Sequence, residues 1–213
     1  MKVVKRTDDN ITKILTSFIG SCENLMLLEN EILKIDKITI PQYANYLSQI
    51  ALCVELGMKS ILINENDIYK THDLKELYSK MPSAFRDMFE NNPFPKKTID
   101  KSLEKIKTIF EDFRYMNIEN FSFFLDKSIF DTDYKIIFSQ VLRLQNFQFI
   151  IFFLNEIKKF RKFLNKCIDK DFFKNIEKRG FTFKVDSENI NKAIKKYHDE
   201  IKNIQLTAYV EKI

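Results

Sequence analysis

Residues 43–63, YANYLSQIALCVELGMKSILI, form the stretch that decides the predicted fold. Its apolar side chains recur at three- and four-residue steps, which places them on one face of a helix that needs a core to pack against. They are Tyr43, Leu47, Ile50, Ala51, Val54, Met58, Ile61 and Leu62. Glu55 and Lys59 stand four residues apart on this helix, a spacing that favours an ion pair. In so apolar a segment we interpret the pair first as a buried contact that fixes helix register, and second as part of a binding site.

A short helix is predicted over residues 74–81, within the segment YKTHDLKELYSKMP at residues 69–82. The Asp73 side chain can cap its first turn, and Glu76 follows three residues later as in a capping box. His72 is thereby fixed just outside a helix start. A histidine in this position more often bonds the local backbone than takes part in catalysis.

Helical periodicity continues along the rest of the chain, interrupted by short polar connections. Helices are predicted over residues 9–33, 41–63, 74–81, 98–114, 132–164 and 187–209, with a further short turn over residues 83–92. NENDIYKT, residues 64–71, is interpreted as a polar connection. FTFKV, residues 181–185, is interpreted as an extended linker, because a lone strand has nothing to pair with. The pattern predicts an all-α, single-domain bundle of five to seven helices over residues 1–213.

The first two segments together resemble the HEPN superfamily of helical nucleotide- and RNA-binding domains. The features that carry the resemblance are an apolar helix bearing Glu55 and Lys59, followed by the HDLKELY turn into a short helix. FEDFRYMNIEN, residues 110–120, is similar to the aromatic-Arg-Tyr stretch that follows this helix in some members. The resemblance covers roughly residues 41–120 and implies a HEPN-like core with residues 122–213 as a family-specific helical extension.

Composition excludes several classes of site. The net charge of +5 comes from 35 basic and 30 acidic residues, a milder excess than a dedicated duplex-DNA binder carries. Cys22, Cys53 and Cys167 lack CxxC spacing, so we interpret them as reduced, structural thiols. The sequence contains no glycine-rich phosphate loop, no GxSxG turn and no cluster with metal-ligand spacing. We therefore expect no cofactor and no metal.

The location of the protein is predicted from its apolar runs. MKVVKRTDDN at residues 1–10 is basic but is followed by no secretory apolar run. The most apolar window, FQFIIFFL at residues 147–154, is far shorter than the roughly 20 residues that span a bilayer. We expect a cytoplasmic protein with no membrane association.

Catalytic HEPN ribonucleases carry an Arg followed four to six residues later by His, and the pair meets its copy across a dimer. The Arg can hold the phosphate while the His moves the proton of the attacking 2′-hydroxyl. Neither histidine of this chain, His72 or His198, has an Arg at that spacing before it. The remaining catalytic candidates are Arg114 and His72, and the ligand-binding candidates are Arg114, Tyr115, Glu119, Glu55 and Lys59.

A basic run, KKFRKFLNK at residues 158–166, suggests a second kind of site. Lys158, Lys159, Arg161 and Lys162 alternate with phenylalanines, a pattern that can grip a nucleic-acid backbone. In the alternative interpretation, which we favour, the phenylalanines face the core and the cations are solvated near a helix end.

The resemblance implies a non-catalytic RNA- or nucleotide-binding protein that forms a homodimer. It also implies a bacterial defence, toxin–antitoxin or regulatory setting, with a partner protein such as an antitoxin. Two other functions stay open. One is a divergent, metal-independent endoribonuclease, and the other is a helical protein-interaction component with an exposed apolar patch and no pocket at Arg114.

Overall fold

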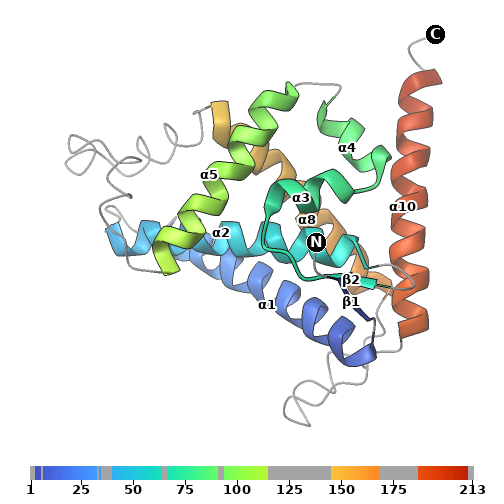
Figure 1. Cartoon of the computed structure of the whole chain (residues 1–213), viewed down its shortest axis with the longest axis horizontal. Helices are drawn as coiled ribbons and strands as arrows, with labels where there is room; N and C mark the ends of the chain where they lie inside the picture. The colour runs from blue at the N-terminus through green and yellow to red at the C-terminus, as the bar shows by residue number, and fades with distance from the viewer. Residues whose placement is uncertain are drawn as a thin grey trace.

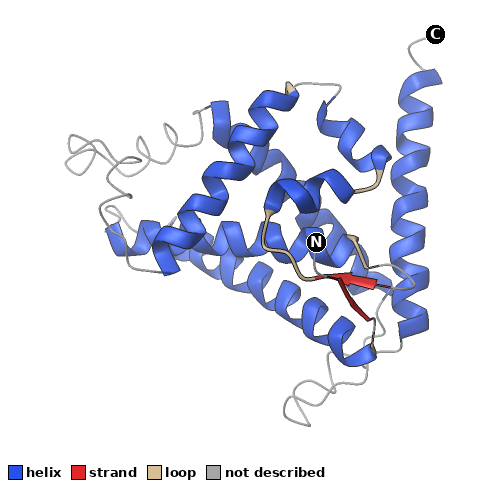
Figure 2. Cartoon of the chain, in the orientation of Figure 1, coloured by secondary structure: helices blue, strands red, loops and turns tan. Residues whose placement is uncertain are grey.

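Seven helices dominate the part of the chain that the computed structural model describes, residues 3–5, 7–32, 34, 40–63, 67–90, 94–114, 145–167 and 187–210. The helices are α1 Asp8–Ile32, α2 Ile40–Ile61, α3 Leu74–Lys80, α4 Ser83–Glu90, α5 Lys96–Arg114, α8 Gln145–Cys167 and α10 Ser187–Val210. Two short strands, β1 Val3–Lys5 and β2 Asp67–Tyr69, complete the described residues (Figure 2). The predicted all-α bundle of five to seven helices is confirmed.

Helix α2 lies at the centre of the bundle. α1 runs alongside it, α5 crosses it, and α8 packs against α1, α2 and α5 (Figure 1). α10 covers α8 and α4 at one edge of the molecule (Figure 1). Buried side chains from all seven helices belong to one hydrophobic core, so α8 and α10 share the core of the helices that precede them.

An aromatic cluster fastens the short helices α3 and α4 to α8. Phe153 of α8 lies with its ring centroid 5.9 Å from that of Tyr78, 5.6 Å from Phe85 and 5.3 Å from Phe89. Phe149, one turn earlier, contacts the rings of Tyr78, Phe89 and Phe94. Tilted and edge-on rings at these distances add to the free energy gained from burial. The short helices, which would be marginal alone, are held in place by this packing.

Close approach of α2 to α8 depends on Gly57. A Cβ atom added there would lie 2.6 Å from Cγ2 of Ile157, closer than two carbon atoms can pack. Gly20 on α1 has no such neighbour, because nothing lies within 4 Å of the equivalent position. The glycine on α2 therefore permits a helix contact that a larger residue would prevent.

The sequence interpretation missed the strands. Residues 64–71 were expected to be a polar connection, yet β2 within them pairs antiparallel with β1, with Ile68 opposite Val4. Ile68 is buried, which explains why an extended segment forms between two helices. The beginning of the helix expected over residues 132–164, and FTFKV, lie outside the described residues.

Helix α1 also meets a length and composition test for a membrane span. The segment Asp9–Glu31 is apolar enough, with 44% of its most apolar window buried inside the molecule. A core helix of a soluble protein meets the same test, so the observation is weak evidence for a membrane. In this molecule α1 packs against α2 and α8.

Candidate functional site

The expected ion pair on α2 is present and buried. Lys59 Nζ lies 2.7 Å from Glu55 Oε1, and the two side chains are 9% and 7% exposed. Both charges are removed from water, which is costly unless each finds further polar partners. Glu55 finds one in His72.

His72 reaches the same carboxylate from the segment that precedes α3. Its Nδ1 lies 2.9 Å from Glu55 Oε1, although the two residues are 17 positions apart. The expected bond to the local backbone is therefore replaced by a bond to a distant side chain. A carboxylate can only accept, so Nδ1 is the donor in this bond, and 71% of the His72 side chain is exposed.

The start of α3 holds His72 in position, as the sequence predicted. Asp73 Oδ1 accepts the backbone N–H groups of Lys75 at 2.9 Å and Glu76 at 3.1 Å. The Asp73 N–H donates to Thr71 Oγ1 at 3.1 Å. A capped helix start fixes the backbone on both sides of the cap, so His72 is presented to Glu55 by a rigid turn.

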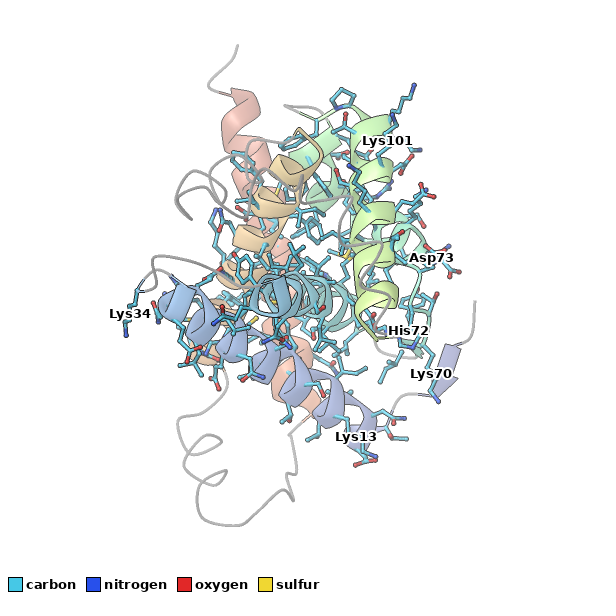
Figure 3. All side chains as sticks on the ribbon, turned by 90° about the vertical axis from the view of Figure 1, so that its left-hand side faces the viewer. Lys13, Lys34, Lys70, His72, Asp73 and Lys101 are labelled. Atoms are coloured by element: carbon cyan, nitrogen blue, oxygen red, sulfur yellow. The ribbon has the colours of Figure 1, made fainter. Side chains whose placement is uncertain are left out.

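A surface pocket of about 340 Å³ adjoins this cluster. Its lining comes from the first half of α1, from α2, and from β2 with the residues that follow it: Asn10, Lys13, Ile14, Ser17, Leu56, Lys59, Ile68, Tyr69, Lys70 and His72. Lys13, Lys70 and His72 lie on the same flank of the molecule in Figure 3. Three lysines and a histidine line the pocket, and none of its described lining residues is acidic.

The pocket combines two kinds of wall. Ile14, Leu56 and Ile68 are apolar, and Tyr69 adds an aromatic ring. Ammonium groups bind phosphate as point charges, while an aromatic side chain can stack on a base. A volume of about 340 Å³ falls in the range of small-molecule sites. The arrangement suits an anion that carries a planar or apolar group.

Two of the lysines that line the pocket pair with acids outside its lining. Asp9 Oδ2 lies 2.6 Å from Lys13 Nζ, with both side chains exposed, so this pair can open at little cost. Glu55 holds Lys59 from the buried side. Among the described residues, no group of three or more His, Cys, Asp or Glu side chains could hold a metal ion.

The structure does not place the other predicted ligand-binding residues relative to this pocket. Arg114 is the last residue of α5, and its side chain lies outside the described residues. Tyr115 and Glu119 lie outside them altogether. Their predicted role in the same cleft as His72 therefore stays a prediction.

The basic run on α8 makes ion pairs within the chain. Lys158 Nζ lies 2.7 Å from Glu29, and an Arg161 nitrogen lies 2.8 Å from Glu23, both acids on α1. Lys159 pairs with Glu156 on its own helix. Lys162 is exposed, and Phe160 is buried in the core. Three of the four predicted nucleic-acid contacts thus have an acidic neighbour, and neither interpretation of this run included these ion pairs.

Sequence reasoning missed Lys13, Tyr69 and Lys70. Lys13 is the exposed residue before Ile14 on α1, a common position for a solvated lysine. Tyr69 and Lys70 fall in the segment interpreted as a connection. Recognising Asp67–Tyr69 as a strand would have directed attention to them, because Ile68 and Tyr69 of this strand and the following Lys70 all line the pocket.

The chain matches no protein-family model, no curated protein and no solved structure. The resemblance to the HEPN superfamily therefore depends on the short motifs quoted above. What the protein binds has to follow from the charge and shape of its pocket.

Proposed function

We propose that the protein is a HEPN-like RNA- or nucleotide-binding protein that does not cleave its ligand, with the pocket between α1, α2 and β2 as its binding site. The observation that carries the proposal is the gathering of Lys13, Lys59, Lys70 and His72 around one pocket beside Tyr69. The bacterial defence, toxin–antitoxin or regulatory setting, the homodimer and an antitoxin-like partner belong to the proposal through the resemblance alone.

The three lysines of the pocket are expected to contribute to binding in different ways. Lys70 and Lys13 are exposed and can move toward a phosphate, whereas Lys59 is fixed by Glu55. An exposed ammonium loses side-chain entropy when it binds, but a fixed one is already ordered. We expect Lys59 to orient the ligand and the two exposed lysines to supply most of the salt-dependent affinity.

Ligand-induced stabilisation tests the proposal. A mononucleotide or a short single-stranded RNA, added at about 100 times its Kd, should raise the melting temperature by roughly 5–10 °C. Lys70→Ala should weaken binding about tenfold, because one charge-assisted contact is lost. Lys162→Ala removes a cation of α8 that is also exposed and serves as the matched control, with unchanged binding expected.

Two outcomes distinguish a failure of the proposed function from a failure of the proposed binding site. Absence of any shift across mononucleotides and single-stranded RNA contradicts the function. A shift that survives Lys70→Ala but is lost in Arg114→Ala contradicts the pocket and transfers the site to the end of α5.

One observation favours the endoribonuclease as a second candidate. Glu55 fixes the tautomer of His72 so that Nε2 can accept a proton from a 2′-hydroxyl, as a general base does. Buried Lys59 would stand beside the developing charge. Purified protein should then cleave RNA without metal ions, and His72→Ala should abolish cleavage while leaving the fold intact. Intact RNA after prolonged incubation with the wild type contradicts this second candidate.

A further inference from the structure

Two cysteines from different helices meet in the core. Cys22 of α1 and Cys53 of α2 are fully buried, and their Sγ atoms lie 3.2 Å apart. They are separated by 31 positions in the sequence, so their spacing alone indicated two unrelated structural thiols. Both are free thiols in this structure.

We propose that Cys22 and Cys53 are a modification site at which a peroxide produces an intramolecular disulfide that joins α1 to α2. The sulfur atoms of a disulfide are about 2.05 Å apart, so they must approach by only about 1 Å. A side-chain rotation can supply most of that movement. Packing of the core does not by itself require the two sulfur atoms to be this close.

The two thiols differ in acidity, which assigns their chemical roles. A hydrogen bond from Cys53 lowers the pKa of Cys22, and the positive charges of Arg161 and Lys158 act in the same direction against burial. The hydrogen bond to Cys22, together with burial, raises the pKa of Cys53 well above its usual value. We assign the first attack to Cys22 because the positive charges of Arg161 and Lys158 favour its thiolate, which is the nucleophilic form.

The reaction balances with a peroxide as the oxidant. The Cys22 thiolate attacks one oxygen of hydrogen peroxide, the O–O bond breaks, and hydroxide leaves to be protonated to water. The resulting sulfenic acid is attacked by the Cys53 sulfur, which forms the S–S bond and releases a second water. Two thiols lose two electrons, and the peroxide gains them.

Two cations of α8, Arg161 and Lys158, pair with acids on the part of α1 near Cys22. Arg161 bonds Glu23, the residue directly after Cys22, and its Nη1 lies 3.4 Å from Met26 Sδ on the next turn. Lys158 bonds Glu29 further along α1. Arg161 and Lys158 thus lie against the part of α1 that carries Cys22, where their positive charges favour the thiolate and the negative charge of Glu23 opposes it.

The bond would link two walls of the pocket. α1 supplies Lys13 and α2 supplies Lys59, so a covalent link between these helices limits how far the walls can separate. Closing a loop of this length restricts the unfolded chain, and the oxidised protein should melt higher by on the order of 10 °C. The disulfide does not depend on the proposed function, because its formation can be measured without a ligand.

The test begins with reduced, purified full-length protein treated with hydrogen peroxide. Intact-mass spectrometry should show the loss of two hydrogen atoms per chain, and a non-reducing peptide map should join Cys22 to Cys53. Melting should move upward by on the order of 10 °C and return after a thiol reductant. Cys167→Ala should behave like the wild type, while Cys22→Ala and Cys53→Ala should lose the linkage and the shift.

If a cysteine variant does not fold, the peptide map of the oxidised wild-type protein still tests whether the disulfide forms. Recovery of both peptides with free thiols, while peroxide oxidises Cys167 or methionines, overturns the proposal. Linkage between chains, or between Cys167 and either buried cysteine, overturns it equally.

Discussion

Two charged regions of this molecule are built against the same helix, α1, and they differ in where their acids lie. At its first half, Lys13, Lys59, Lys70 and His72 surround a pocket whose described lining has no acid. At its second half, Glu23 and Glu29 of α1 face the basic run of α8 and pair with Arg161 and Lys158. The second region has the denser basic sequence, yet the first has the cations that face an open space.

The difference shows that ligand capacity depends on the position of the neutralising charge. On α8, the acids lie across the surface from the cations, so each pair closes on itself. In the pocket, the buried Glu55 carboxylate contacts both Lys59 and His72, and both of these residues line the opening. A buried acid can hold its partners in place for a ligand, whereas an exposed acid competes with the ligand for a cation, as Asp9 does for Lys13.

The largest expected effect comes from removing that buried acid. Glu55→Gln leaves the Lys59 ammonium buried without its counter-charge and His72 without a carboxylate. We expect the free energy of unfolding to fall by about 3–5 kcal/mol, measured by urea denaturation near neutral pH. A loss of stability as small as that from removing an exposed ion pair would contradict the distinction between the two regions.

A double variant tests whether the loss of stability comes from an unpaired buried charge. Glu55→Met combined with Lys59→Met replaces both charges with apolar groups of similar length. It should recover most of the stability lost in Glu55→Gln, because no unpaired charge stays buried. The same variant should bind the phosphate ligand more weakly, since a pocket lysine is gone.

A smaller effect tests the docking of α8 without changing any charge. In Gly57→Ala the new methyl group would collide with Ile157, so α8 must shift. Overpacking of this kind should cost about 1–3 kcal/mol in urea denaturation. Ligand-induced stabilisation should persist, because the pocket lies against α1, α2 and β2 rather than α8.

Gly20→Ala is the matched control for that substitution. The residue is also within a helix, but nothing lies within 4 Å of its added Cβ. Alanine should raise stability by up to about 1 kcal/mol through its helix propensity. Equal destabilisation by both substitutions would show that the α2–α8 contact is not the tight one described.

A still smaller effect is expected at the ion pairs of the basic run. Lys158→Met removes a pair with Glu29 whose side chains are 24% and 28% exposed. We expect a loss of about 0.5–1 kcal/mol that shrinks as salt is added, measured by urea denaturation at two salt concentrations. A loss as large as that of Glu55→Gln would remove the distinction between the regions.

Lys75→Met provides the lower reference, because its pair with Glu104 is more exposed. A hydrogen bond from Lys75 lowers the pKa of Glu104 below its usual value. The pair therefore favours the folded state above the ordinary carboxyl pKa, and this contribution is lost as pH falls through the lowered pKa. Any difference between wild type and variant should disappear in acid.

Local patterns accounted for most of what could be predicted. The helix that starts after His72 follows from the side chain of Asp73, which bonds the N–H groups of its own first turn. The Glu55–Lys59 pair follows from one turn of helix geometry. These features need only a few consecutive residues, so the sequence contains them in full.

Contacts between distant segments could not be predicted in the same way. His72 reaches Glu55 across 17 positions, Cys22 reaches Cys53 across 31, and Lys158 reaches Glu29 across 129. Apolar periodicity indicates which face of a helix is buried, but not which helix will cover it. The strand β2, which brings Lys70 to the pocket, forms only because β1 supplies its partner.

By itself the sequence determined that the chain is helical, where most helices begin and end, and that α2 carries a charge pair in an apolar setting. The tertiary structure decided that this pair would adjoin a basic pocket and that Lys158 and Arg161 of the more basic run on α8 would pair with acids of α1. The physical reason is that helix formation is governed by bonds and side chains within a few residues. The surroundings of a charge, in contrast, are set by how whole helices pack.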